Sequence, residues 1–178
     1  AQELDFSAGW TGEVTSGLKV DVGGTYYTYP NAVNRTANID FVTPTISGYP
    51  KFDSYSKYDT DYFEFYGKLM PTLGPVGFTF AAYYAPNQDS LGGGDNLYLA
   101  ADASVGVPHT PITLTAHAGY TDGFLTYTSS GHAWDYSVGA SVTVLGKVTL
   151  GVAYVGVDGV KIDGVTDDTV VGTLSVSF

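Results

Sequence analysis

Apolar and polar residues alternate with a period of two along much of this chain. The pattern is plain in residues 170–178, which read V-V-G-T-L-S-V-S-F. One parity is apolar apart from a single glycine, and the other carries mostly hydroxyl side chains. Because successive side chains of a β-strand point to opposite faces, the alternation predicts a strand that separates two unlike environments.

Similar alternation recurs upstream, so the sequence predicts nine strands. Their ranges are 3–14, 18–29, 61–69, 76–84, 96–107, 112–120, 134–144, 147–156 and 170–178. Short connections alternate with long ones: the short ones are 15–17, 70–75, 108–111 and 145–147, and the long ones are 30–60, 86–95, 121–133 and 157–168. Short turns at one end and long loops at the other are typical of a transmembrane β-barrel.

The charged residues follow the same parity. All ten that fall inside the predicted strands lie on the polar parity: Glu3, Asp5, Glu13, Lys19, Asp21, Glu64, Lys68, Asp102, Asp135 and Lys147. A charge facing the acyl chains at mid-bilayer costs about 2–4 kcal/mol, so a barrel in lipid turns this parity toward its lumen. We therefore predict an all-β fold, a transmembrane antiparallel up-and-down β-barrel formed by a single domain over residues 1–178.

Aromatic residues of the apolar parity collect beside the long loops. They are Tyr26, Phe63, Tyr84, Tyr120, Trp134, Tyr136 and Tyr154. Amphipathic rings prefer the membrane–water interface, so we expect one aromatic girdle, with the long loops on the outer side of the membrane.

Composition limits the choice of partners. Charged residues make up 14 % of the chain, well below the roughly 25 % of an ordinary soluble domain. The net charge of −11 argues against nucleic-acid binding, which needs a basic surface. We expect the lipid bilayer and lipopolysaccharide as partners, together with further copies of the chain or other outer-membrane proteins.

The number of strands raises a problem of closure. Nine strands leave the two edge strands parallel, whereas bacterial barrels have an even number of strands and must close in lipid. We therefore expect that one or three strands are missing at the N-terminus and that the complete barrel has 10 or 12.

Four phrases resemble the TorF-type family of proteobacterial outer-membrane porins. They are A-G-W-T-G-E-V at 8–14, L-K-V-D-V-G-G-T-Y-Y-T-Y-P at 18–30, D-N-L-Y-L-A-A-D-A-S-V-G-V-P at 95–108 and L-T-A-H-A-G-Y-T-D-G at 114–123. The resemblance covers essentially the whole chain, except that an N-terminal R-G-x-S-Q phrase of the family is missing. It implies a twelve-stranded porin in the outer membrane of a Gram-negative bacterium. The final Phe178 after a strand likewise resembles the terminal strand of such barrels, where it carries the assembly signal. The family supplies no catalytic or substrate residues.

Inward ionisable residues are the candidates for a pore lining. They are Glu13, Lys19, Asp21, Glu64, Lys68, Asp102, His117 and Asp135. Charges that face a cavity inside a membrane mark ion pathways, and here they favour a weak preference for cations. Alternatively, the charges pair across the lumen and hold solvated filler in place. A barrel of ten or twelve strands lies between filled eight-stranded barrels and open sixteen-stranded porins, so any channel is narrow.

Two further features point to binding. The first is a set of inward tyrosines, namely Tyr27, Tyr62, Tyr66, Tyr83 and Tyr98. Their rings predict a constricted lumen or a track on which carbohydrate stacks. The loop 157–168 offers the carboxylates of Asp158, Asp163, Asp167 and Asp168, whose oxygens suit Ca²⁺ although their spacing is not that of an EF-hand. We expect no other cofactor and no metal site.

The sequence does not suggest an enzyme. His117 with Asp102 or Asp135 is the best acid–base pair available, and no positioned nucleophile accompanies it. We expect a narrow passive porin for small solutes or ions. The alternative is a structural or surface-interaction barrel with a plugged lumen, in which the loop 30–60 contacts neighbours or folds inward. A soluble β-sandwich is a third interpretation, for which the outward parity is too apolar.

Overall fold

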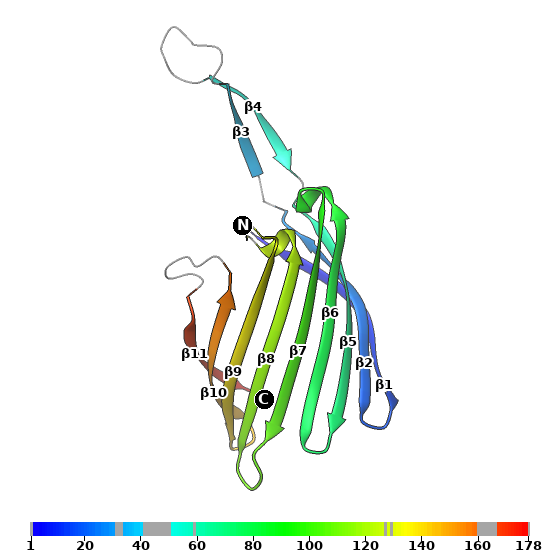
Figure 1. Cartoon of the computed structure of the whole chain (residues 1–178), viewed down its shortest axis with the longest axis vertical. Coiled ribbons are helices and arrows are strands. Elements are labelled where there is room, and N and C mark those ends of the chain that lie inside the picture. The colour runs from blue at the N-terminus through cyan, green and yellow to red at the C-terminus, as the bar shows by residue number, and fades with distance from the viewer. Residues whose placement is uncertain are drawn as a thin grey trace.

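Nine strands form one continuous antiparallel sheet (Figure 1) in a computed structural model, which describes residues 2–30, 34–40, 51–58, 60–126, 128, 130–159 and 167–177. The strand order is β1-β2-β5-β6-β7-β8-β9-β10-β11. Their bounds are Leu4–Thr15 for β1, Leu18–Thr28 for β2, Tyr62–Leu73 for β5, Val76–Gln88 for β6, Gly94–Gly106 for β7, Ile112–Gly123 for β8, His132–Val144 for β9, Val148–Asp158 for β10 and Thr169–Val176 for β11.

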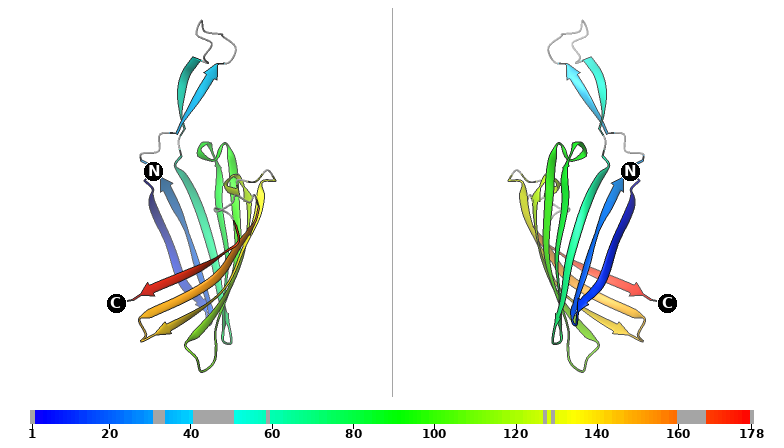
Figure 2. Two further views of the ribbon diagram at one scale, coloured as in Figure 1. Left: turned by 90° about the vertical axis from the view of Figure 1, so that its left-hand side faces the viewer. Right: turned by 90° about the vertical axis from the view of Figure 1, so that its right-hand side faces the viewer.

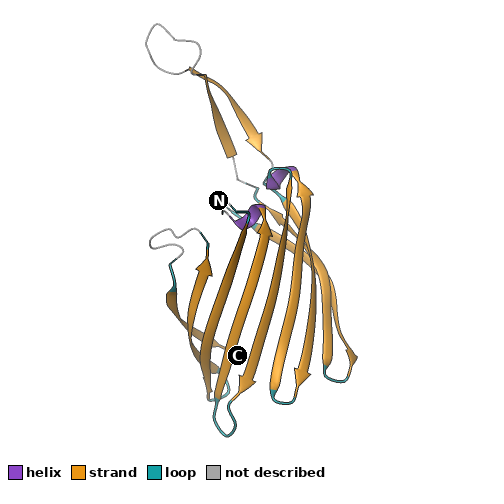
Figure 3. Ribbon diagram, viewed as in Figure 1, coloured by secondary structure: helices purple, strands orange, loops and turns teal. Residues whose placement is uncertain are grey.

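The prediction of an all-β, antiparallel, up-and-down fold is confirmed. Each strand of the sheet pairs with the next one, and the described helical residues form only the short 3₁₀ turns η1 (Asp89–Leu91) and η2 (Phe124–Thr126) in two of the long connections (Figure 3). Within the described residues, no helix has the length and apolar character needed to cross a membrane.

The sheet is a single curved layer (Figure 2). Its edges are β1 and β11, which do not pair with each other in the described structure. Because neighbouring strands alternate in direction, the two edges of a nine-stranded sheet run the same way. The structure therefore shows an open, curved sheet rather than a closed barrel.

The turn after β5 lies later than the sequence predicted. We expected the Met70–Pro71 dipeptide to begin the turn, but β5 continues to Leu73 and the chain reverses at Gly74, whose φ is +60°. Proline lacks a backbone donor, and the pairing of β5 with β6 has a gap at residues 70 and 71. The strand thus accommodates the proline without losing its direction.

The long connection after β2 contains an element that the sequence did not predict. Strands β3 (Asn34–Asp40) and β4 (Lys51–Tyr58) form a separate two-stranded sheet, which extends beyond the end of the large sheet (Figure 1). The β3 residues N-R-T-A-N-I-D contain only two apolar residues, Ala37 and Ile39, so the alternating signal of this segment is short and weak.

The sheet has little interior of its own. Among the described apolar residues only Ala81, Ala85 and Leu91 are buried. Large apolar side chains are instead exposed along one face, as with Val138 at 60 % and Leu174 at 69 %. A soluble sandwich would cover such a face with a second sheet, and no second layer packs on it in the described part of the chain.

Candidate functional site

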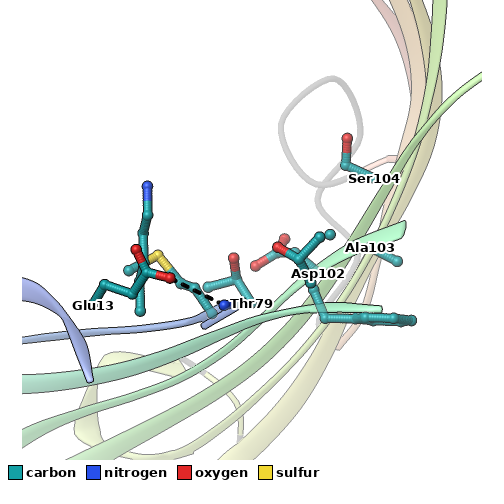
Figure 4. A pocket seen from close by; sticks show the side chains of 11 residues that line it. Glu13, Thr79, Asp102, Ala103 and Ser104 are labelled. Carbon is teal, nitrogen blue, oxygen red and sulfur yellow. Dashed lines mark hydrogen bonds between the residues drawn. The ribbon is translucent and has the colours of Figure 1, made fainter. Parts of the chain in front are cut away.

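The eight ionisable candidates share one face of the sheet. Side chains of residues directly opposite each other on adjacent strands point to the same face of a sheet. Three such pairs are Glu13–Lys19, Asp21–Lys68 and Asp102–His117. The remaining two follow the same parity: Glu64 lies opposite Thr25, and Asp135 lies opposite Gly119. Figure 4 shows Glu13 and Asp102 projecting from the inner side of the curved sheet, so this is the concave face.

A first hollow lies on the concave face near the short-turn end of β1 and β2. Its volume is about 290 Å³, and its lining includes Glu13, Lys19, Thr79, Asp102 and Ser104 (Figure 4). The Glu13 carboxylate also accepts a hydrogen bond from the backbone N–H of Gly17 at 3.1 Å, which holds it beside the β1–β2 turn. The hollow is therefore lined with both acidic and basic groups.

A second hollow lies further along the concave face and shares Thr79 and Asp102 with the first. Its volume is about 400 Å³. We call it the central hollow, and its residues are Glu64, Lys68, Thr79, Ala81, Tyr83, Tyr98, Ala100, Asp102 and His117. Because the two hollows share part of their lining, polar space continues along the concave face from the short-turn end to the middle of the sheet.

Lys68 has both a charged and an aromatic neighbourhood. Its Nζ lies 3.7 Å from Oδ2 of Asp21, on the adjacent strand β2. The same ammonium lies 5.0 Å from the ring centre of Tyr66 and 5.6 Å from that of Tyr83, within the range of cation–π attraction. The lysine side chain is therefore held in place over the sheet.

His117 joins two carboxylates from the neighbouring strands. Its Nδ1 lies 2.7 Å from Oδ1 of Asp102 on β7, and its Nε2 lies 2.7 Å from Oδ1 of Asp135 on β9. The Tyr98 hydroxyl lies 3.2 Å from the same Asp135 oxygen and 3.0 Å from the histidine Nε2. We call these four residues the histidine cluster. A carboxylate only accepts hydrogen bonds, so the geometry fits a doubly protonated imidazolium between two acids.

The histidine cluster is poorly arranged for acid–base catalysis. Each ring nitrogen of His117 already faces a carboxylate oxygen, which leaves neither positioned to take a proton from an attacking hydroxyl. The arrangement instead holds the imidazole ring between two carboxylates on the concave wall.

Three tyrosines form a row across the concave face. Tyr66, Tyr83 and Tyr98 are cross-strand partners on β5, β6 and β7, with adjacent ring centres 6.0 Å apart. The ring of Tyr66 lies over the neighbouring strands, since a Cβ added at Gly9 or Gly23 would be 2.7 Å from the Tyr66 hydroxyl oxygen. The other inward tyrosines, Tyr27 and Tyr62, stack on each other with ring centres 4.6 Å apart.

The aromatic residues of the expected girdle lie on the opposite, convex face. Four of their tyrosines donate a hydrogen bond to an aspartate near the long-loop end: Tyr26 to Asp61 at 3.0 Å, Tyr84 to Asp95 at 3.1 Å, and Tyr136 and Tyr154 to Asp168 at 3.2 and 2.9 Å. Each hydroxyl thus points toward a charged group at one level of the sheet, while the ring stays on the apolar face.

Asp61 also ties the end of β2 to the start of β5. It accepts hydrogen bonds from the Thr28 hydroxyl and from the backbone N–H of Tyr29, both at 2.8 Å. Burial, followed by a hydrogen bond with Glu3, raises the pKa of the Tyr29 phenol above its ordinary value. This end of the sheet is therefore held by side chains as well as by the strand ladder.

The calcium prediction lies largely outside the described residues. Residues 160–166 of that loop, including Asp163, are among those that the structure does not describe. Within the described ranges, no group of three histidine or acidic side chains is arranged to hold a metal ion. Phe178, the predicted assembly signal, also lies outside the described residues.

The sequence predicted the face of the ionisable residues and a pairing of His117 with Asp102 or Asp135, and the structure shows His117 in contact with both. Parity alone placed the inward residues, whereas the histidine cluster and the tyrosine row depend on the register between strands. The turn positions would have given that register: a hairpin reversing at residues 74–75 sets Tyr66 opposite Tyr83. The aspartate partners of the girdle tyrosines lie at strand ends, where alternation carries no information.

The comparisons with known proteins identify a family and no activity. A family model described as "Bacterial protein of unknown function (Gcw_chp)" matches residues 1–54 and 46–178. No curated protein and no solved structure matches the chain. The function must therefore be argued from the geometry of the two faces.

Proposed function

The chain belongs to the bacterial Gcw_chp family, whose function is unknown, and we propose that it is an outer-membrane β-barrel forming a narrow passive channel for small solutes or ions. This proposal agrees with what the resemblance to TorF-type porins implies. The residues that would line the channel are those of the concave face.

The observation that carries the proposal is the contrast between the two faces of a single sheet. The convex face exposes large apolar side chains along its length, including Trp10 at 56 % and Val138 at 60 %. Soluble monomers rarely expose so extensive an apolar surface. Hydrocarbon would cover it without a second protein layer, and the ionisable groups of the concave face would then line an aqueous lumen.

The tyrosine–aspartate pairs support an interface at the long-loop end. Rings that lie in the hydrocarbon edge with hydroxyls directed to a polar layer are the usual arrangement of an aromatic girdle. The pairs of Tyr26 with Asp61 and Tyr84 with Asp95 have this form. They would set the depth of the sheet, with the long loops on the outer side.

The two connected hollows support a water-filled path rather than a filled interior. They run along the concave face and are lined by groups of both signs, with Asp102 common to both. The proposal further requires that the backbone groups of the edges β1 and β11 be paired in the membrane, because lipid offers them no hydrogen-bond partner.

Single-channel recording in planar bilayers tests the proposal. Purified protein should give discrete current steps with a preference for cations. Asp102→Asn removes a carboxylate from the concave face and should lower the preference for cations. Lys68→Met removes the ammonium that lies beside Asp21 and should raise the preference for cations. Asp89→Asn removes a carboxylate from the exposed turn η1 and should change the selectivity less than either substitution.

Two results would contradict the channel. The first is purified, folded protein that gives no current above the bilayer background, which would favour the structural barrel with a plugged lumen. The second is current whose ion selectivity is unaffected by both Asp102→Asn and Lys68→Met, since the ions would then not pass along the concave wall.

A further inference from the structure

The central hollow combines aromatic rings with hydrogen-bonding groups of both kinds. We propose that it is a binding site for a neutral saccharide, with the sugar ring against Tyr83 and Tyr98 and its hydroxyl groups bonded to Glu64, Lys68 and Asp102. The inference rests on the proposed channel, because it names the class of solute that the concave wall recognises.

The aromatic wall of the hollow is open to a ligand. The rings of Tyr83 and Tyr98 are tilted by 38° with their centres 6.0 Å apart, so neither covers the other. Tyr27 and Tyr62 behave differently: they are nearly parallel and in contact, with 18° between their planes. Stacking covers one face of each ring in the Tyr27–Tyr62 pair. The Tyr83–Tyr98 pair is not stacked in this way, so it can offer apolar surface to the C–H face of a sugar.

The base of the hollow is small and apolar. Ala81 and Ala100 are cross-strand partners directly beside the Tyr83–Tyr98 pair, and both contribute to the lining. Larger side chains at these positions would fill the space in front of the rings. The volume of about 400 Å³ falls within the 300–1,000 Å³ range of ordinary ligand pockets and suits one or two sugar rings.

The polar groups suit hydroxyls, which both donate and accept hydrogen bonds. Glu64 and Asp102 are acceptors, and the Lys68 ammonium is a donor. These three lie on β5 and β7, so they approach the hollow from two sides of β6. A hydroxyl-rich ligand would satisfy all three at once.

The charges argue against an ionic ligand. An organic cation in the hollow would meet the like charge of the Lys68 ammonium, which lies near the rings of Tyr66 and Tyr83 and beside Asp21. An anionic ligand would meet the carboxylates of Glu64 and Asp102. A neutral polyhydroxylated solute avoids both repulsions.

Calorimetric titration of the purified protein in detergent micelles tests the inference with three probes. Maltose should bind saturably. Glucosamine and glucuronate should each bind at least about tenfold more weakly than maltose, a difference in binding free energy of about 1.4 kcal/mol or more. Failure of maltose to bind, or tighter binding of either charged sugar, would overturn the inference without any variant being made.

A pair of variants on the same strand locates the site. Tyr83→Ala should weaken maltose binding about tenfold, while Phe80→Ala removes a ring of similar size from the convex face, where Phe80 is 49 % exposed, and should leave binding unchanged. Should Tyr83→Ala not fold, Asp102→Asn replaces it, with the same expected loss. Equal affinity in wild type and in the folded concave-face variant would exclude the central hollow as the site.

The titration tests the saccharide site and the conductance measurement tests the channel, so their outcomes can be told apart. A preparation that conducts ions but does not bind maltose would overturn the saccharide site and leave the channel intact. A preparation that binds maltose but gives no current would overturn the channel and keep the hollow as a binding site.

Discussion

At the scale of single residues, glycines make room for the tyrosines of the concave wall. Gly119 on β8 lies under Tyr98: a Cβ added there would come within 2.7 Å of Cε2 of that ring and would also meet the Tyr98 hydroxyl and an Asp135 oxygen. The absence of a side chain at this position therefore allows the histidine cluster to form.

Substituting this glycine should loosen the cluster. Gly119→Ala should destabilise the protein by about 1–3 kcal/mol, because the added methyl overlaps a packed ring. Gly77→Ala is the matched control on β6, since a Cβ there meets nothing within 4 Å and should be neutral or stabilising by up to about 1 kcal/mol. Denaturant unfolding in micelles, followed by tryptophan fluorescence, measures both; equal effects of the two substitutions would contradict the packing described here.

At the scale of elements, the hairpins determine which residues meet on the concave face. The turn between β9 and β10 has positive φ at both Leu145 (54°) and Gly146 (66°), and it is closed by a hydrogen bond from the N–H of Lys147 to the carbonyl of Val144. Glycine adopts this conformation freely, whereas leucine does so at a cost of about 1–2 kcal/mol. The Leu145 side chain is 93 % exposed, so its packing does not compensate for that cost.

Replacing this leucine should show whether the turn is strained. Leu145→Asn should stabilise the protein by roughly 1 kcal/mol, since asparagine tolerates positive φ, and Leu145→Val should destabilise it because a β-branched residue does not. The same unfolding measurement applies. If Leu145→Val raised the free energy of unfolding as much as Leu145→Asn, the positive φ of residue 145 would not be a source of strain.

Alternation was sufficient to predict the elements wherever one face is apolar throughout. It placed all nine strands of the sheet and the face of each ionisable candidate, because a period of two leaves no freedom in the direction of a side chain once the strand is known. It missed β3, which has only the two apolar residues Ala37 and Ile39, and β4, whose aromatic residues fall on both parities. It also began the turn after β5 at Met70–Pro71, although the strand continues to Leu73.

The groupings within the site depended on information that alternation does not hold. The sequence suggested that His117 pairs with Asp102 or with Asp135, but contact with both acids at once depends on two strand registers. The tyrosine row needs the turn position that the Met70–Pro71 dipeptide obscured. The aspartates that receive the girdle hydroxyls, such as Asp61 and Asp168, lie just outside strands, where local sequence does not determine which side chain they reach.

At the scale of the whole molecule, the proposed membrane barrel requires that hydrocarbon touch the convex face. The chain contains two tryptophans, and both are on that face: Trp10 is 56 % exposed near the middle of β1, and Trp134 is 53 % exposed at the long-loop end of β9. Their fluorescence therefore reports directly on the environment of the apolar surface, at two different depths.

Quenching of these tryptophans by brominated lipids tests directly whether hydrocarbon covers the convex face. Each single-tryptophan variant is reconstituted in vesicles. In Trp134→Phe, where only Trp10 remains, lipids brominated deep in the acyl chain should quench more strongly than lipids brominated near the headgroup. In Trp10→Phe, where only Trp134 remains, the order should be reversed. Aqueous iodide should have little effect on Trp10. Strong iodide quenching of Trp10 together with no quenching by either brominated lipid would show that water, not hydrocarbon, covers the convex face, and would contradict the proposed membrane barrel.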